Sequence, residues 1–158
     1  MRLIAAVLFA VCTLAAQPPA SLVKSHFTGV WKLVSCESRS PAGELAKPYG
    51  DKPQGRLVYE ADGHVSLQIM RPGNRFRLIT RASLPTENNK DDFSEAWFGT
   101  WDVDPETETV IHQVQQSIDP AQVGTEITRR YNFWSNRMIL VGIVGGRAWR
   151  LVWEHESF

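Results

Sequence analysis

The sequence predicts an all-β domain whose antiparallel strands follow one another up and down and close into a barrel of about eight strands, with one short helix. Three observations predict this class. Short runs of alternating apolar and polar residues recur along the chain, Gly, Asp, Asn and Pro mark turns between them, and successive runs form hairpins without a long crossover. A two-sheet sandwich has a similar strand pattern, but the missing crossover favours the barrel.

The expected elements follow in order along the chain. The only plausible helix covers residues 83–98, where its apolar side chains would lie over one opening of the barrel, and residues 76–80 are a possible extra strand. Strong turn signals are Asp62-Gly63 and Gly145-Gly146. The main strands are expected at 29–37, 55–60, 64–70, 99–104, 110–117, 125–133, 137–144 and 147–155.

The first sixteen residues have the layout of a secretory signal. Arg2 supplies a positive charge, residues 3–14 are almost continuously apolar, and Ala15-Ala16 offers small residues for cleavage before Gln17. This run falls short of the roughly 20 apolar residues that a transmembrane helix needs. We expect a mature protein without a membrane span that is secreted or periplasmic. An uncleaved anchor or lipidation at Cys12 are the weaker alternatives.

Removing residues 1–16 from the 158-residue chain leaves 142 residues, which fits one domain over 27–158 behind a flexible lead-in at 17–26. Without Arg2, 16 basic residues face 17 acidic ones, so composition gives no electrostatic case for nucleic acid. Cys36 alone remains, which excludes an intramolecular disulfide, and its apolar neighbours indicate a buried, unreactive thiol.

Residues 110–131 form the hairpin around which a ligand site is expected. Side chains alternate faces along a strand, so His112 shares a face with Val110, Val114 and Gln116, and Arg129 shares one with Thr125, Ile127, Tyr131 and Phe133. Arg129, rather than its neighbour Arg130, is expected inside because its parity matches that of Ile127 and Tyr131. An imidazole, a guanidinium and a phenol among apolar neighbours suit a small-molecule pocket.

The strand at 64–70 is expected to complete this pocket. Its two faces carry Val65, Leu67 and Ile69 on one side and Ser66, Gln68 and Met70 on the other, and either face could be interior. Polar side chains buried without a partner cost several kcal/mol, so they bond either one another or a ligand. The predicted ligand-binding residues are Ser66, Gln68, Met70, His112, Arg129 and Tyr131.

The chain also resembles the lipocalin-like domains of the calycin group. The resemblance covers about 27–154 and implies an antiparallel barrel with a central cavity for a small apolar or amphipathic ligand. By analogy with true lipocalins, Trp31 would be a scaffold residue at one end of the barrel, covered by Arg147 or Arg150 of the last strand. Gln113 stands where the resemblance leads us to expect a second histidine. The matching segments are 29–34, 63–72, 99–101, 110–117, 124–125, 129–131 and 151–154.

Two functions remain open at this point. One is an exported protein that binds a small molecule in the barrel. The other is a cofactor-independent isomerase, cyclase or hydratase, with His112 as general base and Arg129 or Tyr131 stabilising an oxyanion. A filled barrel that binds protein on its outer face is the third possibility. Isolated histidines and the missing phosphate-binding loop predict neither a metal nor a cofactor, and the sequence gives no oligomeric state.

Overall fold

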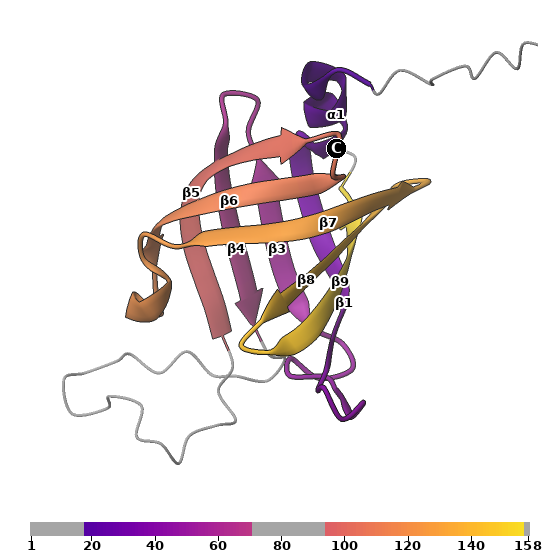
Figure 1. Cartoon of the computed structure of the whole chain (residues 1–158), viewed down its shortest axis with the longest axis vertical. Coiled ribbons are helices and arrows are strands. Elements are labelled where there is room, and N and C mark those ends of the chain that lie inside the picture. The colour runs from indigo at the N-terminus through magenta and orange to yellow at the C-terminus, as the bar shows by residue number, and fades with distance from the viewer. Residues whose placement is uncertain (1–17, 71–93, 157–158) are drawn as a thin grey trace, which may run out of the picture.

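The computed structural model describes residues 18–70 and 94–156, and the strands in these ranges form one closed antiparallel barrel (Figure 1). The hydrogen-bonded order is β1-β3-β4-β5-β6-β7-β8-β9, and β9 pairs back onto β1. The two-residue β2 pairs antiparallel with the last two residues of β1. The strands are β1 Gly29–Arg39, β2 Leu45–Ala46, β3 Gln54–Tyr59, β4 His64–Met70, β5 Ser94–Asp104, β6 Thr109–Ser117, β7 Glu126–Trp134, β8 Arg137–Val144 and β9 Arg147–His155.

The predicted fold class is confirmed, and the expected main strands are present with changes of at most two residues at their ends, except that β5 begins five residues earlier than expected. Successive strands pair as hairpins, and the turn residues behave as expected: Gly63, Gly145 and Gly146 all take positive φ angles. The possible strand at 76–80, the N-terminal part of the predicted helix and the signal at 1–16 lie outside the described residues.

The helix prediction was wrong where the structure can test it. Residues 94–98 belong to β5, which begins at Ser94, because Trp97 faces inward as strand alternation requires and is 3% exposed. The short helix α1 is instead Ala20–Phe27, which covers most of the segment 17–26 that we expected to be a flexible lead-in and the first residue of the expected domain. A further 3₁₀ turn, η1, covers Pro120–Gln122 between β6 and β7.

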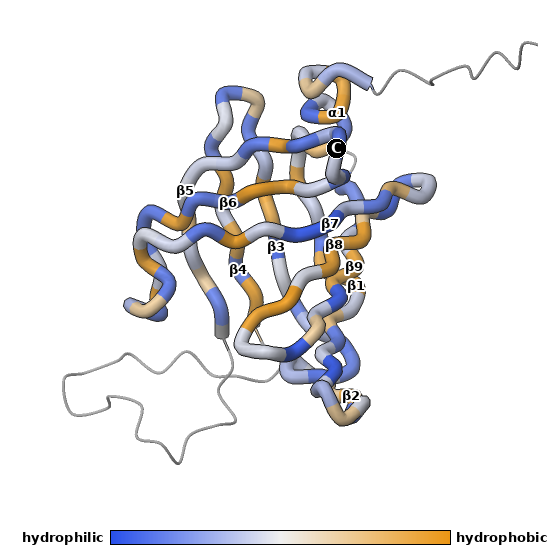
Figure 2. Tube along the Cα trace, viewed as in Figure 1, coloured by the Kyte–Doolittle hydropathy of each residue, from blue (hydrophilic) through white to orange (hydrophobic). Residues whose placement is uncertain are grey.

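Helix α1 lies over one end of the barrel, whereas β2 lies at the opposite end (Figures 1 and 2). It begins after Pro19, whose carbonyl accepts from the amides of Leu22 and Val23, and its last residue, Phe27, is fully buried. The Phe27 ring has edge contacts with Tyr59, Tyr131 and Phe133 at 4.9–5.2 Å. Such aromatic pairs contribute about 0.5–1.5 kcal/mol each beyond area burial, so α1 is a packed cap on this end.

Lys24 holds the outer side of this cap. Its ammonium is 2.9 Å from Asp102 and lies 5.4 Å from the ring centroid of Trp101, both on β5. The side chains are partly exposed, so these contacts orient the helix more than they stabilise it. Among the described residues, no helix is long and apolar enough to cross a membrane.

Alternation along the strands separates interior from surface, as the hydropathy along each strand in Figure 2 illustrates. Two bulges interrupt it. In β1 the pairing with β9 shifts between Leu33 and Ser35, and in β6 the pairing with β5 shifts where Phe98-Gly99 meets Gln116 and Val114. Beyond a bulge the side chains change face, because one residue has no partner opposite it. The second bulge therefore decides which residues of β6 point into the barrel.

Candidate functional site

A hydrogen-bonded pair from opposite sides of the barrel marks the centre of the candidate site. Tyr59 on β3 and His112 on β6 are both 1% exposed, and the Tyr59 Oη to His112 Nε2 distance is 2.7 Å. The other ring nitrogen, His112 Nδ1, is 3.2 Å from the carbonyl oxygen of Ile127 on β7. Since a carbonyl only accepts, Nδ1 carries the proton and Nε2 accepts from the Tyr59 hydroxyl.

The surroundings of His112 keep the imidazole neutral. Burial lowers its pKa to about 3, and the positive charge of Arg129 acts in the same direction. The rings of Tyr59 and Trp97 lie 5.7 and 5.4 Å from the imidazole ring, which leaves it enclosed by aromatic groups. A neutral imidazole whose lone pair already accepts a hydrogen bond is a poor general base.

Arg129 on β7 is the charged group in this interior. It pairs across the sheet with Val110, and it is 7% exposed, while Arg130 beside it lies on the outer surface. The parity argument that placed Arg129 inside is confirmed. Within the described residues the Arg129 guanidinium makes no hydrogen bond or ion pair, and its Nη1 atom is buried without a partner. Burying a charge in this way is costly.

Gly142 on β8 provides room for the Arg129 side chain. A methyl group added at Gly142 would lie 3.2 Å from Cγ of Arg129, tighter than an ordinary van der Waals contact. On its other side Gly142 pairs with Trp149 of β9. The glycine therefore lets the stem of Arg129 lie against the wall of the barrel next to Trp149.

A second polar group lies nearer the end away from α1. Glu95 at the start of β5 accepts a 2.8 Å bond from the hydroxyl of Tyr49 and a 3.0 Å bond from Nε1 of Trp97. Both burial and the nearby Glu95 carboxylate raise the pKa of Tyr49. Each Glu95 oxygen thus already has a donor from the protein.

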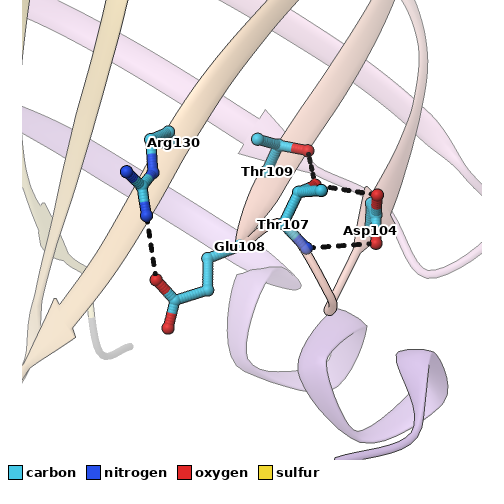
Figure 3. Close-up of polar contacts among 5 residues, drawn as sticks. All are labelled: Asp104, Thr107, Glu108, Thr109 and Arg130. Atoms are coloured by element: carbon cyan, nitrogen blue, oxygen red, sulfur yellow. Dashed lines mark hydrogen bonds and ion pairs between the residues drawn. The ribbon is translucent and has the colours of Figure 1, made fainter. Parts of the chain in front are cut away.

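Tyr131 faces inward from β7 but is not part of the pair formed by Tyr59 and His112. Its ring packs against Phe27 and Phe133 beneath α1, and burial together with the Glu108 and Asp104 carboxylates raises the pKa of its hydroxyl. Its backbone amide donates to the carbonyl oxygen of Glu108 in the β5–β6 turn at 2.9 Å. Figure 3 shows this turn, where Glu108 also pairs with the outward-facing Arg130 at 3.4 Å.

The placement expected for the β4 residues was wrong. Val65, Leu67 and Ile69 face the core and are at most 4% exposed, which puts Ser66, Gln68 and Met70 on the outer face, Met70 with 43% of its surface exposed. The apolar face is interior because most positions inside the barrel require apolar packing. Ser66 and Gln68 border a surface groove between β4 and β5 instead of the interior.

Two other residues also lie elsewhere than expected. Gln116 is exposed, because the bulge in β6 reverses the face after Val114. Thr125 lies before the start of β7 and is exposed. The hairpin alternation therefore predicts the inner face correctly only for the regular part of each strand.

Trp31 has a structural position, but its expected arginine cover is wrong. The indole Nε1 donates to the carbonyl oxygen of Phe27 at 2.7 Å, and the ring meets His155 edge-on at 4.9 Å. Arg150 faces solvent, and Arg147 lies toward the other end of the barrel, 3.3 Å from Ser38 Oγ. The aromatic neighbour from β9 that contacts Trp31 is thus the imidazole of His155, which meets the indole edge-on.

The end of the barrel opposite α1 carries an open pocket of about 690 Å³. Ser38 and Trp149 border it, and both lie on the inward-facing rows of β1 and β9. Two residues of the inner wall thus reach the pocket, and its other lining residues are Glu44, Leu45, Ala46, Pro48 and Arg147.

Cys36 is buried as predicted, with 1% exposure, and burial raises the pKa of its thiol to about 12. On the surface, Glu60, Asp62 and His64 bring possible metal-ligand atoms within 4.8 Å of one another at the β3–β4 turn. All three are exposed, and His64 is already 3.0 Å from Asp62. Neither group adds to the site inside the barrel.

Comparison with known families agrees with this architecture. A model of the lipocalin-like domain matches residues 28–154, from the start of β1 almost to the end of β9. The chain belongs to the lipocalin-like domain family. This confirms the resemblance that the sequence segments indicated, and with the closed barrel it places the protein among folds that enclose small molecules. A search of curated proteins found no match.

Sequence reasoning missed three polar residues of this lipocalin-like barrel. Tyr59 ends a strand in an apolar context, Glu95 falls in a segment predicted to be helical, and Tyr49 belongs to a loop. The alternation of Leu57 and Tyr59 is the signal that could have identified the first. Nothing local to residues 44–53 indicates that Tyr49 reaches Glu95, because that contact depends on the closed barrel.

Proposed function

We propose that this protein binds a small apolar or amphipathic molecule inside its barrel, and that the molecule enters at the end opposite α1. The observation that carries the proposal is the open pocket of about 690 Å³ at that end, bordered by the inward-facing Ser38 and Trp149. Pockets that hold small molecules typically have volumes of about 300–1,000 Å³ and combine apolar walls with a few polar groups. The opposite end is filled by Phe27 and its aromatic neighbours.

Catalysis in the same barrel has less support. His112 donates from Nδ1 and accepts at Nε2 within the protein, and a pKa of about 3 leaves it little capacity to take a proton. Among the described residues, neither Tyr131 nor Arg129 is hydrogen-bonded to His112. Replacing His112 with Gln separates the two functions: binding should remain, whereas proton transfer would fall about 10²–10⁴-fold.

Export is a second part of the proposal. The charged and apolar layout of residues 1–16 supports it, together with the small residues Ala15 and Ala16 at the expected cleavage site. Mass measurement of the protein recovered from culture medium or periplasm should give a chain starting near Gln17. Full-length protein confined to the cytosol would contradict export without affecting the binding proposal.

Native mass spectrometry of gently purified protein tests binding directly. A bound compound should appear as a defined mass increment that is lost on denaturation and can then be identified. The control for the entry route is an Ala46→Trp variant, which narrows the pocket beside Ser38 without altering an inward-facing side chain of the core. Slower uptake of 1-octanol by this variant is expected, and an unchanged rate would show that entry is elsewhere.

A further inference from the structure

The guanidinium of Arg129 indicates the chemical class of the ligand. We propose that the barrel binds an amphipathic carboxylic acid, whose carboxylate pairs with Arg129. The inference rests on the proposed binding function and deepens it. Its starting point is a side chain that is 7% exposed, carries a permanent positive charge, and has a buried Nη1 atom with no protein partner among the described residues.

Residues 18–70 and 94–156 do not supply the missing partner. The interior carboxylate in these ranges is Glu95, and its two oxygens accept from Tyr49 and Trp97 instead of from Arg129. His112 cannot accept from Arg129 either, because its lone pair accepts from Tyr59. The adjacent Arg130 shows the contrast, since on the outer surface it has a partner in Glu108 (Figure 3).

The local charge at the guanidinium selects a monoanion. Among the buried polar residues of the described chain, Ser38, His112 and Arg129, only Arg129 is charged, since His112 is neutral, and the partly buried Glu95 is bonded to Tyr49 and Trp97 instead. One guanidinium balances one carboxylate, to which its planar fork can donate two parallel hydrogen bonds. A phosphate monoester would leave excess negative charge in an apolar interior.

The surroundings of Arg129 select an acid with an apolar body. Its cross-strand partner Val110 is fully buried, and Val114, Leu140 and Leu151 elsewhere on the inner wall are at most 3% exposed. A small hydrated anion would lose its water here without gaining apolar contacts, whereas an alkyl or aryl acid gains them.

The strand register links this site to the proposed entrance. Trp149 borders the open pocket and pairs with Gly142, and Gly142 lies against Cγ of Arg129. A single strand, β8, therefore separates Arg129 on β7 from the pocket wall on β9, which places the residue within reach of a molecule that enters from that end.

Calorimetric titration with octanoate, 1-octanol and acetate tests the inference in the full mature chain. Octanoate and 1-octanol have the same chain length and differ in charge, while acetate has the charge without the chain. Wild-type protein should bind octanoate at least about tenfold more tightly than 1-octanol, since hydrogen bonds to charged groups are worth about 1.5–3 kcal/mol. Arg129→Met should lose this preference and keep its affinity for 1-octanol. Arg130→Met, on the outer face of the same strand, is the matched control and should retain the preference.

The other outcomes separate the two proposals. Equal wild-type affinity for octanoate and 1-octanol would overturn the assignment of the acid and leave small-molecule binding intact. Acetate binding as tightly as octanoate would show that Arg129 takes only a small anion, or a water in its place, which also overturns it. If neither octanoate nor 1-octanol bound, the proposed function itself would fail. The wild-type comparison requires no variant, so a misfolded Arg129→Met protein could not obscure the result.

Discussion

Arg129 carries the largest energetic conflict at the residue scale. A permanently charged group without a partner among the described residues destabilises the ligand-free barrel, because its hydration is lost without compensation. In the proposed function the same group binds the carboxylate of the ligand. Function and stability therefore oppose one another at this position, as they often do where a binding group is held in an apolar site.

Arg129→Met should make the ligand-free protein more stable. Methionine keeps most of the apolar stem against Gly142 and removes the buried charge, so we expect a gain of about 1–4 kcal/mol in the free energy of unfolding. Urea denaturation of wild type, Arg129→Met and the surface variant Arg130→Met measures it. A loss of stability in Arg129→Met alone would mean that the guanidinium has a structural partner inside the barrel.

His112 predicts how stability depends on pH. Its folded pKa of about 3 lies below its ordinary value of 6.5, so below pH 6.5 the unfolded chain binds a proton that the folded chain does not. Its contribution to stability is complete above pH 6.5 and decreases as the pH falls, by up to about 1.4 kcal/mol per unit.

The difference in unfolding free energy between wild type and His112→Gln isolates this contribution. Measured between pH 7 and pH 5, where most carboxylates remain ionised, wild type should lose stability more steeply than the variant. Parallel curves for the two proteins would show that His112 takes up a proton equally well in the folded and unfolded chain, which would restore it as a candidate base.

These residues also show what could be predicted from the sequence. Parity placed His112 and Arg129 inside because both lie in regular parts of their strands. The same reasoning was wrong for Ser66, Gln68 and Met70. Alternation along β4 shows that the strand has two faces but not which one is interior, and in the structure the apolar face is the interior one. The partner of His112, Tyr59, lies 53 positions away in the sequence, so only the closed barrel brings the two together.

At the scale of elements, the bulge of β6 decides which side chains reach the interior. Gly99 of β5 lies so close to this bulge that a Cβ there would overlap the carbonyl oxygen of Gln113. The glycine allows the two backbones to approach, and the shift in pairing after it turns Gln116 outward. The sequence around Gly99 does not distinguish it from any other glycine in a strand, so neither the bulge nor the outward turn of Gln116 could be predicted from it.

Gly99→Ala should therefore be strongly destabilising. The obstructing atoms are backbone atoms that cannot move aside without breaking the β5–β6 pairing, so we expect a loss of about 3 kcal/mol or more. The control is Gly124→Ala, where no atom lies within 4 Å and only the positive φ opposes the side chain. Thermal unfolding compares the two, and an equal, small effect at both positions would contradict the close approach at the bulge.

At the scale of the whole molecule, the pairing of β1 with β9 closes the barrel. Trp31 pairs with His155 and Arg39 with Ala148, so the seam runs along both strands and leaves neither with an open edge. It also brings the first and last strands of the barrel together. Because α1 comes directly before β1 in the sequence, the position of β1 also fixes where α1 begins to pack. The fold class was predictable because each hairpin is local, whereas this seam depends on the number and tilt of all the strands.

A circular permutant tests this closure. Joining Glu156 to Pro19 through a flexible linker of about ten Gly and Ser residues, with new ends between Gly145 and Gly146, should preserve the barrel, because the exposed β8–β9 turn is the only connection removed. Circular dichroism and cooperative thermal unfolding should match those of the original chain. Loss of cooperative unfolding would indicate that the β8–β9 hairpin must form first.

The β1–β9 pairing also determines how late in synthesis the barrel can close. Lys32 pairs with Glu154, 122 positions later in the chain. At a synthesis rate of about 5–20 residues per second, the edge of β1 that pairs with β9 stays unpaired for roughly 6–24 s. During that interval the nascent protein is an open sheet with unpaired backbone groups on β1, the condition in which strands of neighbouring chains can add to one another. Protection from aggregation is therefore complete only after the last strand has been made.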